Sequence, residues 1–182
     1  MATKTAPASS AVLFFYFDYS KQASQTPHRV LQTLLHQILS TYSRIPRQAS
    51  ILARELMAGR PLPSWEDMQD LFIDLCSQGS PVFIVLDALD ECDAKDNRKP
   101  ILKLIKAIRA SSARLLVTSR PYPPDVNESL GDCPKISVEA HPEDIERYVL
   151  EQIDENVEMR EMLDDELRKS VVEFILTKSQ GM

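Results

Sequence analysis

Short apolar runs separated by stretches of helical periodicity are the feature that most constrains the fold of this chain. Four such runs occur, at residues 11–17 (AVLFFYF), 82–86 (VFIVL), 114–118 (RLLVT) and 136–138 (ISV). They are continuously apolar and do not alternate with polar residues, which is typical of strands that are covered on both faces in a parallel sheet. Strands of this kind that alternate with helices predict an α/β fold.

The helices predicted between these strands begin at residues that favour helix N-termini. These residues are Thr26 before Pro27, Pro46, Ser64 and Pro100. Thr26 and Ser64 can accept hydrogen bonds from first-turn amides, and Ser64 is followed three residues later by Asp67, a variant of the capping box. Gly59 is suited to end the helix that starts at Pro46.

The last third of the chain differs from the rest. Residues 142–153 and 160–178 have the pattern of two helices rich in charged side chains. We therefore expect a flexible N-terminus at residues 1–10, a sheet-bearing core at residues 11–140 and a helical appendage at residues 141–182.

Composition excludes several classes of protein. The formal net charge is −6, and no basic stretch interleaved with aromatic residues occurs, so a nucleic-acid or anionic-membrane surface is not expected. No apolar stretch approaches the roughly 18 residues of a membrane span. The three scattered cysteines fit a reducing compartment, and we expect a cytoplasmic protein.

An acidic cluster follows the second apolar run, in the segment 81–92 (PVFIVLDALDEC). The run would deliver Asp87 to the carboxyl end of a buried strand, where ligands of open α/β sheets bind. A carboxylate at this place can hold Mg²⁺ through water, and Asp90 and Glu91 are placed to polarise an attacking water. The alternative is a structural acidic turn in which Asp90 or Glu91 caps the next helix.

The third run ends in polar residues that would face the same crevice. It continues from residue 114 to residue 121 as RLLVTSRP, so Thr118, Ser119 and Arg120 come at or just after the strand's carboxyl end. A guanidinium there can bind a phosphate through two hydrogen bonds. The alternative for Arg120 is a surface arginine before a proline-rich turn.

Together, DALDEC and LLVTSRP resemble the Walker B and sensor motifs of NACHT NTPases. More narrowly they resemble the fungal, nephrocystin-type branch of the signal-transducing STAND class. FFYFDYS followed by TPHRVLQTLLHQIL is similar to the second strand and helix of that branch. HPEDIERYVLEQI and the final KSQGM resemble its post-sheet helix and the start of its lid subdomain.

The resemblance implies a P-loop NTPase core of the ASCE type, a three-layer α/β/α parallel sheet. It implies that Asp87 is the magnesium carboxylate and that Asp90 or Glu91 orients the hydrolytic water. Arg120, with Ser119 beside it, matches the sensor that contacts the nucleotide. In the intact family the cofactors are Mg²⁺ and ATP, and slow hydrolysis controls self-association in signal transduction.

The phosphate-binding loop of such NTPases, G-x-x-x-x-G-K-[ST], is missing from these 182 residues. None of the four glycines is followed by lysine. We therefore expect a fragment without its P-loop strand, which does not bind ATP tightly and does not hydrolyse it alone. Uncovered strand edges and apolar faces then favour self-association or other protein partners.

Two alternatives remain open from the sequence. The first is a non-catalytic pseudo-NTPase that serves as an interaction module. The second is an unrelated metal-dependent α/β hydrolase that uses Asp87 and Asp90.

Overall fold

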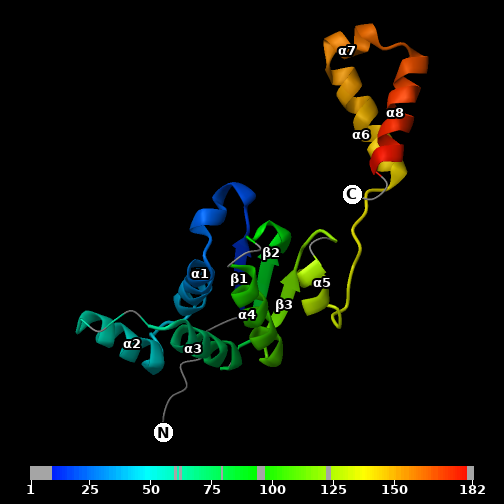
Figure 1. Ribbon diagram of the computed structural model, residues 1–182. Coiled ribbons are helices and arrows are strands. Elements are labelled where there is room, and N and C mark those ends of the chain that lie inside the picture. Colours follow the sequence, from blue (N-terminus) through cyan, green and yellow to red (C-terminus); the bar gives the residue numbers. More distant parts are fainter. Residues whose placement is uncertain are drawn as a thin grey trace. The chain divides into compact units, whose positions relative to one another are not determined.

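The computed structural model describes residues 10–59, 61, 63–78, 80–93, 97–121 and 124–179, apart from the side chains of Leu56 and Ser179. Nearly all of the N-terminus expected to be flexible, and the last three residues of the expected lid start, lie outside these ranges. The chain divides into two compact units, Met1–Asp132 and Cys133–Met182, and each is described by itself. Figure 1 shows the elements coloured along the sequence.

The first unit is built on a three-stranded parallel sheet. Its strands are β1 (Ala11–Tyr16), β2 (Val82–Asp87) and β3 (Arg114–Val117), in the order β1-β2-β3. Leu13 pairs with Ile84 on β2, which pairs in turn with Leu115 on β3. Three of the four predicted strands and the α/β class are therefore confirmed.

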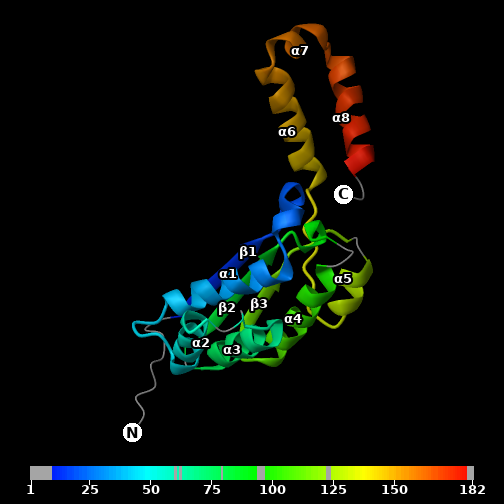
Figure 2. The same ribbon diagram turned by 60° about the vertical axis from the view of Figure 1, so that its left-hand side comes forward.

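One face of the sheet is covered by helices (Figures 1 and 2). The helices that make this layer are α1 (Pro27–Ser40), α3 (Trp65–Ser77) and α4 (Arg98–Ala110). Leu13, Ile84 and Leu86 on the sheet pack against apolar stripes of these helices, and almost no solvent reaches them. The shorter elements of the unit are η1 (Tyr19–Ser24), α2 (Arg47–Met57), η2 (Leu89–Glu91) and α5 (Pro124–Ser129).

The helix starts follow the capping chemistry, with one correction. Thr26 accepts a hydrogen bond from the Arg29 amide (3.3 Å), and Ser64 and Asp67 form the full reciprocal capping box. Gly59 has a φ of 77°, as expected for a residue just past a helix end. The prediction that Pro100 opens α4 was two residues late, because α4 begins at Arg98.

The opposite face of the sheet carries apolar side chains that no described residue of this unit covers fully. Val12, Phe14 and Tyr16 on β1 are 62%, 45% and 58% exposed, and Leu116 on β3 is 57% exposed. The described residues of this unit thus form two layers, sheet and helices, where three layers were expected. The apolar composition of β1 had predicted burial on both faces, but only alternate residues are buried.

The outer edge of β1 is capped by two glutamine side chains. The Gln37 amide accepts from the Phe14 N–H (2.8 Å) and donates to the Phe14 carbonyl (2.9 Å), as a neighbouring strand would. Gln25 donates to the Tyr16 carbonyl (2.9 Å) and accepts from the Asp18 N–H (2.9 Å). These contacts occupy backbone groups that would otherwise favour pairing with another chain.

The predicted strand at residues 136–138 is wrong. In the structure Ile136 and Val138 are 88% and 90% exposed, and the segment is not a strand. A strand is stabilised by a hydrogen-bonded neighbour, and none of the pairings in the described sheet involves this segment. The apolar side chains of Ile136 and Val138 are therefore exposed and do not belong to a buried strand.

The second unit is a small helical unit. It consists of α6 (Pro142–Glu155), α7 (Val157–Met162) and α8 (Asp165–Ser179), around a core of Val149, Ile153 and Val172. The helix predicted at 142–153 is confirmed. The helix predicted at 160–178 is instead broken in two, because the Asp164 carboxylate accepts from the Leu167 N–H (2.9 Å) and starts a new helix there.

Candidate functional site

The carboxyl ends of β2 and β3 lie side by side, and Thr118 joins them. The Thr118 N–H donates to the Leu86 carbonyl (3.0 Å), and its carbonyl accepts from the Leu89 N–H (2.9 Å). Its hydroxyl accepts from the Ala88 N–H (2.9 Å) and donates to the Asp87 carboxylate. Sequence reasoning noted Thr118 at this strand end but assigned it no role, and the structure makes it the junction of the two strands.

The turn after β2 has an unusual backbone conformation. Ala88 adopts the left-handed region, with φ 53° and ψ 47°, before the single 3-10 turn η2. For a residue other than glycine this costs on the order of 1 kcal/mol. Thr118 accepts hydrogen bonds from the Ala88 and Leu89 amides, and Leu89 is completely buried. These interactions offset the cost and fix the turn.

Asp90 and Arg120 meet across the two strand ends. The Asp90 carboxylate accepts from the Arg120 N–H (3.1 Å), and Arg120 Nε lies 3.6 Å from its second oxygen. The Asp90 side chain is only 11% exposed, whereas that of Arg120 is 79% exposed. The structure therefore brings together two of the residues singled out from the sequence, one from each strand end.

Glu91 points to a different neighbour. Its carboxylate accepts from the Tyr19 N–H (2.9 Å), and its carbonyl accepts from the Gln22 side chain (2.7 Å). Both partners belong to η1, the segment that follows β1. Glu91 thus links the turn after β2 to η1, the turn after β1. Its carboxylate has a different partner from that of Asp90.

We call Asp87, Asp90, Glu91, Thr118 and Arg120 the acidic corner. Ser119 lies beside the acidic corner. Its hydroxyl donates to the backbone carbonyl of the next residue, Arg120 (3.0 Å). Within the described ranges no three His, Cys, Asp or Glu side chains gather as a metal cluster. One carboxylate with a neighbouring hydroxyl, Asp87 with Thr118, matches the donor set of a cation that keeps most of its waters, as Mg²⁺ does.

The match to a known family covers this corner. Residues 2–120, well over half of the chain, match the family described as Nephrocystin 3, N-terminal. The chain belongs to this family. All five residues of the acidic corner lie within the matched part, and the helical unit lies beyond it. No curated protein matches the chain.

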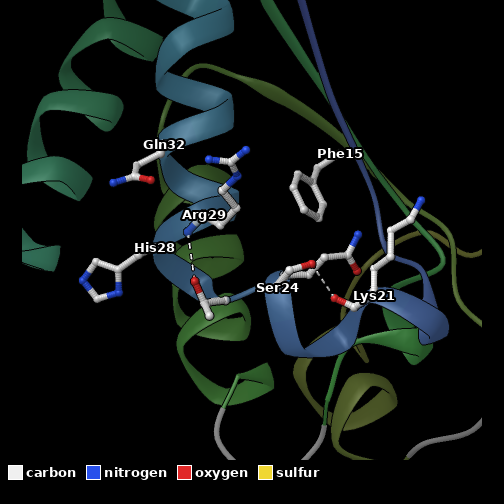
Figure 3. Close-up of a pocket in the computed structure, with 8 residues that line it drawn as sticks. Phe15, Lys21, Ser24, His28, Arg29 and Gln32 are labelled. Carbon is white, nitrogen blue, oxygen red and sulfur yellow. Dashed lines mark hydrogen bonds between the residues drawn. The ribbon is translucent and has the colours of Figure 1, made fainter.

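A depression in the family domain shares no lining residue with the acidic corner, and Figure 3 shows the residues that line it. It has a volume of about 460 Å³ and is open to solvent at the start of α1. The residues that line it are Phe15, Lys21, Ser24, Gln25, Thr26, His28, Arg29 and Gln32. None of the residues predicted from the sequence to form a site is among them.

Arg98 was not singled out from the sequence, although among the described residues it is the one charged side chain that is buried. It is 5% exposed, and its guanidinium donates to the carbonyls of Asp90 (2.9 Å) and Cys92. In the structure Arg98 is the first residue of α4, where the helix dipole disfavours a cation. Because the sequence predicted that this helix begins at Pro100, it gave no signal of the tertiary contacts of Arg98.

Among the residues that the structure describes, no helix has the length and apolarity required to cross a lipid bilayer.

Replacing Thr118 by valine is expected to lower the free energy of unfolding by roughly 1–2 kcal/mol, because the Ala88 N–H and the Asp87 carboxylate each lose a partner. Thr118→Ser keeps the hydroxyl and should lose less. Thr33→Val, on α1, is the matched control, since the Thr33 hydroxyl donates only to the Arg29 carbonyl of its own helix. Urea denaturation of the four proteins measures the effect. Equal losses in Thr118→Val and Thr33→Val would contradict the assigned role.

Two of the three thiols are expected to be unreactive at neutral pH. Burial raises the pKa of Cys92 to about 11 and that of Cys76 to about 12, from 9.0. At pH 8, alkylation followed by mass spectrometry should therefore modify the half-buried Cys133 first. Because the folded chain holds these two thiol protons more tightly than the unfolded chain, stability should fall as pH rises from about 9 towards 12. Alkylation of Cys92 as fast as Cys133 would contradict this expectation.

Proposed function

We propose that the acidic corner is the magnesium-facing and γ-phosphate-facing half of a nucleotide switch of the NACHT/STAND signalling type. The observation that carries this proposal is the contact of Asp90 with Arg120 next to the contact of Asp87 with Thr118, at the carboxyl ends of adjacent parallel strands. Ligands of open α/β sheets bind at this edge. Membership of the nephrocystin 3 N-terminal family is consistent with it.

Asp87 is the residue that we assign to Mg²⁺. It ends β2, and one of its oxygens already accepts a hydrogen bond from Thr118. A carboxylate held in this way can bind the water shell of Mg²⁺, and the ion would neutralise charge on the phosphates of ATP. In this assignment β2 is the Walker B strand.

Asp90 is the better candidate of the two acids for orienting the hydrolytic water. Its carboxylate lies next to Arg120, the residue proposed to contact the γ-phosphate. The Glu91 carboxylate instead accepts a bond from the Tyr19 backbone, so a structural role in holding η1 fits it better. In the free chain Arg120 pairs with Asp90, and we propose that a γ-phosphate competes for this guanidinium.

The triphosphate itself needs backbone amides and a lysine that these 182 residues do not supply, since no glycine precedes a lysine. We propose that another segment supplies them in the working protein. The 182-residue chain would then hold an incomplete site, and neither tight ATP binding nor turnover is proposed for it alone.

A second candidate function is a non-catalytic interaction module. The open sheet face favours it, because Val12, Phe14, Tyr16 and Leu116 place apolar side chains together on the surface of one unit. Surfaces of this kind commonly bind proteins. Reading the coding sequence upstream of Met1 separates the candidates: an in-frame G-K-[ST] motif favours the ATPase switch, and its absence favours the module.

Calorimetric titration of the chain with MgATP should give no binding at micromolar concentrations, since only one half of the proposed site is present. Titration of an extended chain that includes the G-K-[ST] motif should give binding that weakens at least about tenfold in Asp87→Asn. Asp74→Asn, on the exposed side of α3, is the control. Micromolar binding to the 182-residue chain, or full binding by the Asp87→Asn extended chain, would overturn the proposal.

Replacing Val12 and Phe14 together by threonine is expected to shift the chain towards monomer, because the exposed face loses two of its apolar side chains while β-propensity is retained. Sedimentation velocity over a concentration series measures this shift. Ile51→Thr, at an exposed apolar position on α2, is the matched control and should leave association unchanged. A wild-type chain that stays monomeric throughout would exclude self-association through this face.

A further inference from the structure

A buried arginine holds the backbone of the acidic corner on the side away from solvent. Arg98 Nη2 donates to the Asp90 carbonyl (2.9 Å) and to the Cys92 carbonyl, and Nη1 donates to the Asp125 carboxylate on α5 (3.2 Å). One guanidinium therefore contacts two elements, the turn after β2 and the helix after β3. The turn contains Asp90 and Glu91, and the helix follows Arg120 in the chain.

These contacts require the shape of arginine. The planar guanidinium presents donors in a fixed fork, so one nitrogen reaches two carbonyls while the other reaches a carboxylate. Lysine places a single ammonium and cannot span the three acceptors. The burial of Arg98 is also costly, and its Nε has no hydrogen-bond partner among the described atoms. A charge kept buried at such cost is expected to have a specific task.

The Asp90 residue is held from both sides. The Arg120 guanidinium contacts its carboxylate and that side chain is 79% exposed, whereas Arg98 contacts its carbonyl and is buried. The guanidinium contact can exchange with solvent or with an anion. The buried contact fixes the main chain, so the position of the turn does not depend on the Arg120 guanidinium remaining bound.

We propose that Arg98 is a positioning residue that keeps the Leu89–Glu91 turn fixed when the Asp90 carboxylate exchanges its partner. It also ties this turn to α5 through Asp125, so that a displacement of the segment after β3 is opposed at the corner. The importance of Asp90 rests on the proposed function, but the holding of the turn by Arg98 does not.

Hydrogen exchange of backbone amides in the full chain tests this role. The reporters are the amides of Leu89, Glu91 and Cys92, which bond to Thr118, Ala88 and Leu89 respectively. In Arg98→Lys their exchange should accelerate at least about tenfold, while the Ile84 amide in the middle of β2 changes by less than about twofold. Equal acceleration at Ile84, or none at the turn, would overturn the proposal.

Two further variants leave Arg98 in place and can be measured even if Arg98→Lys does not fold. Arg120→Gln removes the guanidinium contact with Asp90, keeps the backbone N–H bond, and should leave the three reporter amides protected. Asp125→Asn weakens the tie to α5, and should accelerate exchange at Val126 but not at the turn. Loss of turn protection in Arg120→Gln would show that the exposed arginine holds the turn and would overturn the proposal. Because exchange needs no nucleotide, a failed MgATP titration rejects the proposed function without affecting this result.

Discussion

The hydrogen bonds of Thr118 are the interactions on which the acidic corner depends. Its N–H, its carbonyl and its hydroxyl contact four consecutive residues, from Leu86 to Leu89. These contacts carry the pairing of β2 and β3 beyond the ends of the strands and stabilise the left-handed conformation of Ala88. Without them the two strand ends would lose their direct backbone connection, and the turn that carries Asp90 would be held mainly by Arg98 and by the burial of Leu89.

The acidic corner is held by several hydrogen bonds, whereas the described helices cover only one face of the sheet. One face packs on α1, α3 and α4, and the other leaves Val12, Phe14 and Tyr16 exposed. At about 25 cal/mol per Å² of apolar surface, covering such a face would add several kcal/mol of stability. The Gln37 and Gln25 side chains protect the outer edge of β1, so the apolar face and the edge of β3 are the surfaces that favour association.

Much of the fold could be predicted because its signals are local. Capping at Thr26 and Ser64, and the apolar runs of β1 and β2, depend on residues adjacent in sequence. The errors involve tertiary context. The segment 136–138 has strand composition but lacks a neighbouring strand, and the β1 run is apolar on a face that nothing described covers. Asp87, Asp90 and Arg120 could be found because each follows an apolar run, whereas the roles of Thr118 and Arg98 arise only from contacts across strand ends.

If the carboxyl ends of β2 and β3 form a single cation-binding corner centred on Asp87, a divalent ion should bind there even without nucleotide. Mn²⁺, added alone as a paramagnetic substitute for Mg²⁺, tests this through line broadening in the NMR spectrum of the 182-residue chain. We expect broadening confined to residues 87–91 and 118–120 in the wild type and its loss in Asp87→Asn. Broadening elsewhere in the chain, or broadening at the corner that persists in Asp87→Asn, would show that Asp87 does not centre such a site.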